Sequence, residues 1–403
     1  MKRTHYLELL SNLRDAHVIK VVTGVRRCGK STLLRQFREE LIASSVEPRH
    51  IFACNLDDKA AKSYTQDADL LHDTILAQID DTAMNYVFLD EIQLVPEFER
   101  TLDSLHLREN IDLYVTGSNS DIVSSELGTY LTGRYVEIRM QPLTFQEFLE
   151  FFPDGDRLEK FQLFMRYGGF PEVANFLAAG REMVIPAYLR SIYDTVLEKD
   201  IRRRKKIRSM DDFRRTVEFV LDNVGNITSP NNIANGLRDG KYVVDKETVA
   251  GFLAALEDCY LVYPVQRFDI RGKQLLKTLE KYYAVDLGLI DTVLGLPSDA
   301  NAGHRLENLV FLELNHRYDG RVWIGKNYEK EIDFVAKNPD GTLDYYQVAE
   351  SAAGAETFAR EVASLENTGD RYSKTLLTLD YLETNSGGIA RKNVINWLTE
   401  SGR

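Results

Sequence analysis

The sequence has few cysteines and no long apolar run. Its 403 residues include three cysteines, Cys28, Cys54 and Cys259, which lie far apart and form no C-x-x-C pair. This spacing argues against a disulfide framework and a cysteine zinc cluster, and it fits a reducing cytosol. No apolar stretch approaches the length of a membrane span, and charges interrupt the amino terminus before any signal-type core. We therefore expect a soluble, cytoplasmic protein with no membrane partner.

Positive charge is also scarce. The chain has 50 lysine and arginine residues against 62 aspartate and glutamate residues, a formal net charge of -12. Such a chain is not expected to coat nucleic acid non-specifically, although a local basic face is compatible with this total. The seven histidines are scattered, and no pair stands four residues apart beside a glutamate, so no dedicated zinc site is expected.

The apolar content of 44% is ordinary for a globular protein, and the length predicts two or three domains. In residues 1–141, short apolar runs alternate with amphipathic stretches. This rhythm predicts an α/β fold in which helices wrap a parallel sheet. The strand-like runs are VIKVV, HIFACNL, NYVFLDEI, IDLYVTG and RYVEIRM.

The rest of the chain divides into three segments. Residues 142–200 have helical periodicity with a Gly168-Gly169 breaker, and we interpret them as a helical lid that extends the first domain. Residues 201–290 contain a basic run, three helical patterns and a pair of strands, which is the pattern of a winged helix. Residues 300–403 return to mixed character and predict a second α/β domain.

Residues 24–31 fit the pattern G-x-x-x-x-G-K-[ST] of a phosphate-binding loop, or P-loop. They follow the strand-like VIKVV and precede the helix-like TLLRQFREEL, which are the two contexts that the motif requires. The glycines let backbone N–H groups turn toward phosphate, Lys30 reaches the β and γ phosphates of ATP, and Ser31 can ligate Mg²⁺. The predicted nucleotide-binding residues are Gly24, Val25, Arg26, Arg27, Cys28, Gly29, Lys30, Ser31 and Thr32.

A second signal is the apolar run Val87-Phe88-Leu89, which ends in Asp90 and Glu91. A P-loop ATPase needs an acid at the end of such a strand to hold Mg²⁺ and another to polarise the attacking water. We assign Asp90 to the metal, through a water, and Glu91 to catalysis. Taken alone, the same residues also fit a capped turn.

Two further positions are candidates for the catalytic site. The run LYVTG ends in Ser118 and Asn119, at the edge where open α/β sheets bind ligands, so either residue could sense the γ phosphate. Arg134 stands just before the run YVEIRM and is a candidate to neutralise charge on the transferred phosphoryl group, in its own subunit or in a neighbour. The alternatives are an ordinary turn and a surface arginine.

These motifs resemble a prokaryotic family of AAA+-like P-loop ATPases. The resemblance rests on GVRRCGKST, FLDEIQ, TGSNS, LTGRYVEIRMQPLTFQEFL and YGGFPE, in that order, and it covers essentially the whole chain. It implies an AAA+/ASCE-type parallel sheet, a winged-helix segment and a carboxy-terminal α/β domain similar to restriction endonucleases, which would begin near His304. It implies ATPase activity and leaves the pathway open.

Nucleases of the restriction-endonuclease-like fold need a glutamate, an aspartate and an E-x-K strand to bind magnesium and activate water. The chain offers Glu307 and Asp333, but the third position reads Gln347-Val348-Ala349, which lacks both the acid and the lysine. We therefore predict too little ligand charge, no cation near the nucleophile and no cutting activity. Strand alternation would turn Glu350 to the opposite face.

The leading hypothesis is a Mg²⁺-dependent ATPase whose nucleotide state moves the lid and the winged helix, with an unknown protein or nucleic-acid partner. ATP and Mg²⁺ are the expected cofactors. The alternative is an ATP-regulated DNA-binding protein of initiator or regulator type. Its support is weak, because KETVAGFLAALEDCY, the third helix of the winged segment, has few cations, and the basic run at 202–208 fits a solvated helix face. A homo-oligomer would let Arg134 act across an interface.

Overall fold

The computed structural model describes most of the chain, and the described residues are 1–118, 122, 133–202, 207–238, 244–295 and 301–400. Their packing divides the chain into two compact units. The first unit is Met1–Pro142 with Asp258–Tyr260, and the second is Leu143–Glu257 with Leu261–Arg403. Within the described ranges, no helix has the length and hydropathy that a membrane span requires.

The first unit is built on a five-stranded sheet in the order β2-β3-β4-β1-β5, and every neighbouring pair is parallel. Because all the strands are parallel, their carboxyl ends meet at one edge. β4 lies between β1 and β3, so the strands of the two predicted motifs are separated by one strand. The strands are β1 (Ile19–Thr23), β2 (Ile51–Asn55), β3 (Asn85–Asp90), β4 (Ile111–Gly117) and β5 (Tyr135–Arg139).

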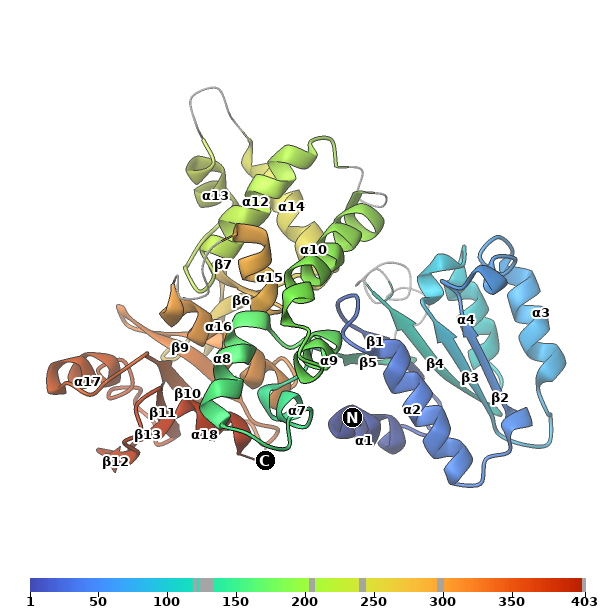
Figure 1. Ribbon diagram of the computed structural model, residues 1–403, viewed down its shortest axis with the longest axis horizontal. Helices are drawn as coiled ribbons and strands as arrows, with labels where there is room; N and C mark the ends of the chain where they lie inside the picture. The colour runs from blue at the N-terminus through green and yellow to red at the C-terminus, as the bar shows by residue number, and fades with distance from the viewer. Residues whose placement is uncertain (119–121, 123–132, 203–206, 239–243, 296–300, 401–403) are drawn as a thin grey trace. The chain divides into compact units, whose positions relative to one another are not determined.

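Helices cover both faces of this sheet, which explains why β1, β3 and β4 are buried along their whole length (Figure 1). On one face, Phe37 of α2 packs on Phe88 and Tyr114, whose rings stack with centroids 4.7 Å apart. On the other face, buried leucines of α3 and α4 join one hydrophobic cluster with β3 and β4. The helical segments are α1 (Thr4–Asn12), α2 (Lys30–Ala43), η1 (Pro48–His50), η2 (Lys59–Ala61), α3 (Ala68–Gln78), η3 (Ile92–Leu94) and α4 (Phe98–His106).

The α/β fold class with a parallel central sheet is confirmed. All five predicted runs form the five strands of the sheet. The runs of β1, β3 and β4 are mostly apolar and buried along their whole length, so burial between two layers of helices is their stable state, whereas the edge strands β2 and β5 are partly exposed.

The second unit begins with helices. The predicted lid segment contains α7 (Phe145–Leu149), α8 (Arg157–Tyr167), α9 (Pro171–Ala178), η4 (Glu182–Val184), α10 (Ile185–Thr195) and η5 (Val196–Arg202). The first of these has a capping box, in which Thr144 and Glu147 satisfy each other's backbone N–H groups. Helices α8 and α10 pack against α15 (Leu287–Leu294), so the lid segment is grouped with the carboxy-terminal half of the chain and not with the sheet of the first unit.

The Gly168-Gly169 breaker fits closely against α15. Gly168 has φ = +76°, and a Cβ at this position would lie 2.1 Å from the Oδ1 atom of Asp286. Asp286 caps the amino terminus of α15 and also accepts a 2.6 Å hydrogen bond from the Gly169 N–H. The end of α8 is therefore tied to the start of α15.

An eight-stranded sheet forms the body of the second unit, in the order β12-β13-β11-β10-β9-β8-β6-β7. Its strands are β6 (Val262–Asp269), β7 (Gln274–Ala284), β8 (Val322–Asn327), β9 (Lys330–Lys337), β10 (Leu343–Val348), β11 (Ser373–Thr378), β12 (Thr384–Ser386) and β13 (Ile389–Asn393). The accompanying helices are α12 (Met210–Asp222), α13 (Pro230–Gly236), α14 (Lys246–Asp258), α16 (Ala302–Arg317), α17 (Ala355–Val362) and α18 (Val394–Thr399).

The predicted winged-helix segment is continuous with this sheet. The three expected helices, α12 to α14, and the expected hairpin, β6 with β7, are present. However, β6 also pairs in parallel with β8, so the hairpin belongs to the same sheet as the carboxy-terminal strands. The divisions expected at residues 201 and 300 therefore both lie inside one compact unit.

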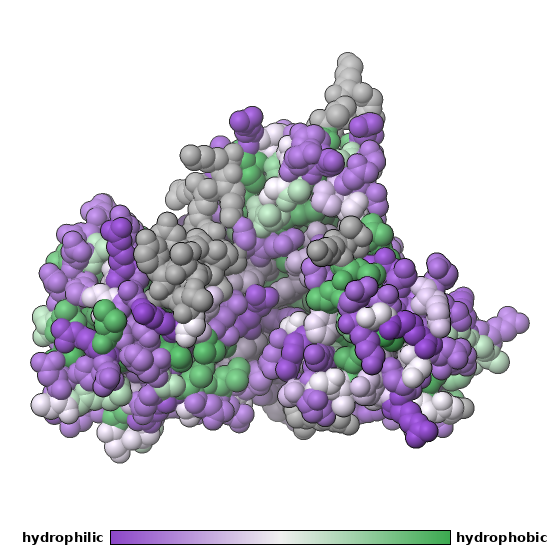
Figure 2. Space-filling view, turned by 180° about the vertical axis from the view of Figure 1, so that it is seen from behind, coloured by the Kyte–Doolittle hydropathy of each residue, from purple (hydrophilic) through white to green (hydrophobic). Residues whose placement is uncertain are grey.

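Hydrophilic residues dominate the face shown in Figure 2, and hydrophobic residues gather there only in small groups. Large exposed hydrophobic side chains are spread over many elements, from Leu107 after α4 to Met183 in η4 and Tyr381 after β11. Single exposed apolar residues are normal for a folded chain and need no special explanation.

Candidate functional site

The P-loop connects the carboxyl end of β1 to the amino end of α2. Gly24 and Gly29 have φ values of +140° and +113°, which only glycine adopts without strain. A Cβ on Gly24 would lie 2.1 Å from the carbonyl oxygen of Met140, so this glycine is also required by close packing. The loop therefore has the backbone that turns N–H groups inward, followed by a helix amino terminus that attracts anions.

Lys30 is the first residue of α2, and its ammonium group lies inside the loop. Its Nζ atom donates hydrogen bonds to the carbonyl oxygens of Gly24 (2.8 Å) and Val25 (3.2 Å). The residue is 5% exposed, so the positive charge is concentrated within the loop. This is the position that the motif predicts for a cation that contacts phosphate.

The other predicted nucleotide-binding residues surround Lys30. Val25 and Cys28 are buried and form the inner side of the loop, while Arg26 is partly buried and Arg27 is exposed. Ser31 and Thr32 are exposed in the first turn of α2, where their hydroxyl groups are accessible to a ligand. The structure thus brings all nine predicted residues into one loop and helix turn.

Arg3 supports the loop from behind, and sequence reasoning did not identify it. Its guanidinium group donates to the carbonyl oxygens of Cys28 (3.4 Å), Gln141 (3.1 Å) and Pro142 (3.4 Å), and it lies over the ring of Tyr6. Arg3 is 5% exposed, so it fixes the loop to the segment that follows β5. No local motif marks this residue, because its partners are up to 139 positions away.

The two acids Asp90 and Glu91 lie at the carboxyl end of β3 and are joined by Thr116 of β4. The Thr116 hydroxyl donates to Oδ1 of Asp90 and accepts a 2.9 Å hydrogen bond from the Glu91 N–H. Thr116 is fully buried, and Asp90 is 9% exposed. The adjacent strand therefore fixes both the carboxylate of Asp90 and the backbone of Glu91.

The end of β4 leads into Ser118, one of the two residues predicted to sense the γ phosphate. Thr23 of β1 pairs with Gly117, so Ser118 follows at the level where the P-loop starts. Ser118 is 1% exposed, and its Oγ atom lies 3.5 Å from the Nε2 atom of Gln93. Asn119, the other predicted sensor, lies outside the described residues. The described part of the strand thus places a polar residue between the P-loop and the two acids.

Arg134 does not lie at this edge. It precedes β5, and its carbonyl oxygen accepts a hydrogen bond from the N–H of Ile19 at the start of β1. Its side chain forms an ion pair with Asp103 of α4. Because β1 spans five residues, about 16 Å of sheet separates Arg134 from the P-loop of its own chain. The own-subunit alternative for Arg134 is therefore wrong in this structure.

The arginine of β5 that does lie at the phosphate edge is Arg139. It pairs in register with Thr23, the residue before the P-loop, and its Nη2 atom is 3.5 Å from Oε2 of Glu137. Oε1 of Glu137 accepts a 2.6 Å hydrogen bond from the Thr23 hydroxyl. Sequence reasoning overlooked Arg139, although its place after the strand core already implied the carboxyl edge.

The residues at this edge fit a magnesium ion that is bound together with nucleotide. Within the described ranges, no group of three or more histidine, cysteine, aspartate or glutamate side chains could hold a metal ion by itself. Magnesium needs no such cage, because it is commonly held by one or two carboxylates together with phosphate oxygens and water. A hydroxyl donor at Ser31 and a fixed carboxylate at Asp90 match that donor set.

The second unit brings the predicted acids Glu307 and Asp333 near a lysine that sequence reasoning missed. Lys281 of β7 contacts carboxylate oxygens of Glu307 (3.0 Å) and Glu331 (2.7 Å), and its side chain is 5% exposed. The hydroxyl of Tyr283 donates to the same Glu307 oxygen at 2.6 Å. The prediction that no cation stands near these acids is therefore wrong, because the hairpin carries Lys281 into the sheet.

The remaining nuclease-like positions are occupied by hydrogen bonds. Oδ2 of Asp333 accepts a 2.8 Å bond from the Val348 N–H. The Gln347 side-chain oxygen accepts from the Ser364 hydroxyl at 3.1 Å. Burial and the nearby Glu307 raise the pKa of Asp333 well above its ordinary value. Glu350 is exposed beyond the end of β10.

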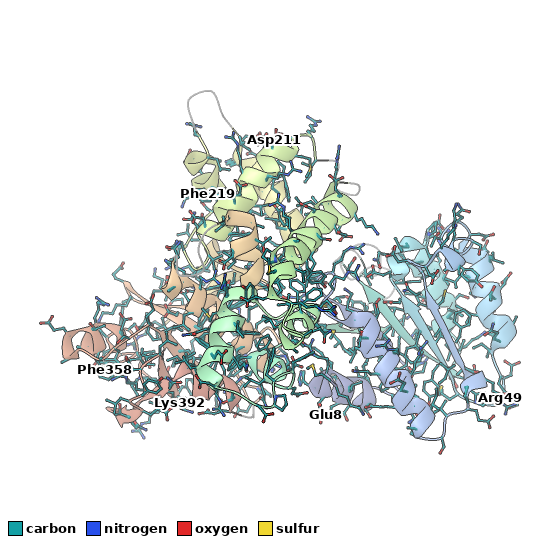
Figure 3. The ribbon with its side chains drawn as sticks, in the orientation of Figure 1. Glu8, Arg49, Asp211, Phe219, Phe358 and Lys392 are labelled. Carbon is teal, nitrogen blue, oxygen red and sulfur yellow. The ribbon has the colours of Figure 1, made fainter. Side chains whose placement is uncertain are left out.

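Two cations in or near the basic run at 202–208, Arg202 and Arg214, are paired with acids. Arg202 contacts Glu198 at 3.1 Å, and Arg214 lies 3.9 Å from Asp211, which Figure 3 labels on α12. Residues 203–206 of the basic run lie outside the described residues. These ion pairs fit a solvated helix face better than a surface prepared for phosphate.

Two family models match the chain. Residues 16–149 match an AAA domain, and residues 158–300 match a domain of unknown function (DUF8612). The first match covers the P-loop, the acid pair and all five strands of the parallel sheet. The second lies within the second unit except for Asp258–Tyr260, which are grouped with the first unit.

The chain is also similar to known proteins, some in sequence and some in structure. An uncharacterized protein of Methanocaldococcus jannaschii is 26% identical over 381 residues, which cover 89% of this chain and 82% of the relative. Among solved structures, the Walker-type ATPase of Pyrococcus abyssi has a TM-score of 0.51 and 15% identity, covering 73% of this chain and 96% of that one. This last likeness supports the fold alone.

A protein of Haemophilus influenzae, described as uncharacterized, is 35% identical over 406 residues, which cover 99% of this chain and 99% of the relative. The alignment therefore covers nearly the whole length of both chains. The chain belongs to the family of this Haemophilus influenzae protein, and its first unit is an AAA-type domain of the P-loop ATPase class.

Proposed function

We propose that the chain is a Mg²⁺-dependent ATPase whose nucleotide state is passed to the second unit, where a macromolecular partner is held. The observation that carries this proposal is the arrangement at the carboxyl edge of the parallel sheet. Lys30 lies inside the P-loop, and Thr116 of β4 fixes Asp90 and Glu91. Strand β4 lies between β1, which leads into the P-loop, and β3, which carries the two acids. A binding loop and a hydrolytic acid pair are thus held on rigid strands.

Each residue has a separate role in the proposed reaction. The P-loop N–H groups and the amino terminus of α2 hold the phosphates, and Lys30 contacts the β and γ oxygens. Ser31 and Asp90 would hold magnesium, which would neutralise the negative charge of the phosphates. Glu91 orients and polarises the water that attacks the γ phosphorus, and Ser118 or Asn119 reports on the γ phosphate.

The contacts of Arg3 support coupling between the nucleotide and the second unit. Arg3 joins the carbonyl of Cys28 in the P-loop to the carbonyl of Pro142, the residue just before the second unit begins. Gly24 packs directly on Met140, and the Met140 N–H donates to the Thr23 carbonyl at 2.8 Å. A shift of the P-loop on binding phosphate would therefore displace residues 140–142.

The second unit is proposed to bind the partner without cutting it. The winged-helix and endonuclease-like readings are part of this proposal, and they are supported by the three helices, the hairpin and the mixed sheet. The carboxylates of Glu307 and Glu331 are already paired with Lys281. A lysine held by two acids occupies the place where a nuclease would need a free set of metal ligands.

Two substitutions test the ATPase proposal. Lys30→Ala should abolish ATP binding, because the buried cation of the P-loop is lost, while Glu91→Gln should keep binding and lose hydrolysis. ATP binding is measured by equilibrium titration with a fluorescent analogue, and hydrolysis is measured by phosphate release. The exposed Lys62→Ala and Glu109→Gln variants serve as matched controls. Unchanged turnover in either site variant would refute the assignment.

A further inference from the structure

We infer that Gln93 is a positioning residue that holds the carboxylate of Glu91 in place for water activation. This inference rests on the proposed ATPase function and concerns the same site. Thr116 fixes only the backbone of Glu91, through the N–H group. The carboxylate itself stands at the end of a side chain with three rotatable bonds, so it needs a separate support to stay aligned with a water.

The support is the side-chain amide of Gln93. Its Nε2 atom donates a hydrogen bond to Oε2 of Glu91, and the same atom lies 3.5 Å from Oγ of Ser118. Glu91 has φ = +57° and starts the short helix η3, so the chain turns back and residue 93 returns to the acid. The amide thus connects the catalytic acid to the strand that carries the sensor position.

The structure provides a fitted place for this amide. A Cβ at Gly117 would lie 2.9 Å from Oε1 of Gln93 and 1.6 Å from Cδ1 of Ile122, so a glycine is needed to admit both side chains. Gln93 is therefore packed against the end of β4 and is not a free surface residue. A positioning group must itself be immobilised before it can immobilise another.

The orientation of the amide is set by Glu91. Oε1 of Gln93 is buried, and among the described residues it has no hydrogen-bond partner. An unpaired buried carbonyl is unfavourable, so this placement is not the best one for Gln93 alone. The opposite orientation would put the amide oxygen against the carboxylate, and the two acceptors would repel each other. The observed orientation is explained if the role of the amide N–H group is to donate a hydrogen bond to the Glu91 carboxylate.

This placement restricts the carboxylate of Glu91 to one position. A misplacement of about 1 Å at a reacting group can cost roughly 100-fold in rate. A fixed carboxylate is therefore better placed to accept a proton from the attacking water.

The test compares Gln93→Met, which fills the same space without a donor, and Gln93→Glu, which places a second acid beside Glu91. We expect kcat for ATP hydrolysis to fall about 10- to 100-fold in both variants, with the Kd for a fluorescent ATP analogue unchanged within about twofold. Gln78→Ala, an exposed glutamine at the end of α3, is the matched control.

A double variant separates this role from a general structural one. In a Glu91→Gln background, Gln93→Met should lower kcat by less than twofold, because the group that it positions is already disabled. An unchanged or increased kcat in the single variant, or a further independent loss in the double variant, overturns the inference. If the wild type hydrolyses ATP and Glu91→Gln does not, only the role of Gln93 has failed. If wild type and Glu91→Gln have equal activity, the proposed function itself has failed.

Discussion

At the scale of single residues, two clusters of acids are each held by one buried side chain from another element of the fold. Thr116 joins Asp90 to the backbone of Glu91, and Lys281 joins Glu307 to Glu331. A charge taken out of water is tolerated only when such partners replace the lost hydration. The two clusters differ in their partners. Asp90 and the backbone of Glu91 are held by the neutral hydroxyl of Thr116, whereas Glu307 and Glu331 contact the charged Lys281.

Lys281 is accordingly predicted to stabilise the fold. Burial alone would lower its pKa, but the nearby carboxylates of Glu307, Asp333 and Glu331 together raise it above the ordinary value. Lys281→Met should lower the free energy of unfolding by about 3–5 kcal/mol, because buried acids are left without a cation. Chemical denaturation at several pH values measures this loss.

The loss should grow as the pH rises from about 5 to 8. In the variant the folded state must keep protons on its buried acids, while the unfolded state releases them above the ordinary carboxyl pKa of about 4. The folded variant then binds more protons than the unfolded one, so its stability falls with increasing pH. Lys392→Met is the control, since Lys392 forms an exposed pair with Glu400 (Figure 3). Equal losses for both lysines would contradict the prediction.

At the scale of secondary-structure elements, the local patterns of the sequence were sufficient for most strands and helices. The runs that became β1, β3 and β4 are mostly apolar on both faces, which is what the central strands of a parallel sheet between two layers of helices require. The P-loop residues were predictable for the same reason, because their spacing is a local property. The short strands β12 and β13 and helix α18 were missed, since Thr384–Ser386 is three polar residues with no apolar period.

Pairings between distant elements were not predictable. Nothing in the local pattern of β6 shows that it pairs with β8, more than fifty residues later, and this pairing brings Lys281 to the acids of α16 and β9. Arg3 was missed for the same reason, because its partners lie up to 139 positions away. Arg134 is different: a residue that precedes a parallel strand must lie at the amino edge, so the sequence already contained the reason that it cannot reach its own P-loop.

The carboxy-terminal sheet is predicted to have no nuclease activity. Gln347 supplies a neutral amide where an acid would be needed, and Lys281 is held by Glu307 and Glu331. The full chain, incubated with supercoiled and single-stranded DNA in the presence of Mg²⁺ or Mn²⁺, should leave the DNA intact on a gel, with or without ATP. Cleavage that requires a divalent metal and disappears in Asp333→Ala would disprove this.

At the scale of the whole molecule, Arg134 and the P-loop lie at opposite edges of one parallel sheet. An arginine at the amino edge lies away from the site at the carboxyl edge of its own chain, so its predicted catalytic role requires a second copy. Its ion pair with Asp103 is partly exposed, with side-chain exposures of 44% and 34%, so the arginine can exchange partners. We therefore expect ATP to be hydrolysed in an oligomer, with Arg134 acting across the interface.

Mixing two inactive variants tests this expectation. Lys30→Ala should be inactive because its own P-loop fails, and Arg134→Ala should lose about 10³-fold in kcat because its neighbour lacks the arginine. In an equimolar mixture that exchanges subunits, intact P-loops meet intact arginines at about a quarter of the interfaces, so activity should return to a comparable fraction. The exposed Arg100→Ala, whose partner is Glu97, should remain active alone. No recovery on mixing, with exchange confirmed by native mass measurement, or a monomer that still hydrolyses ATP, would exclude a trans-acting Arg134.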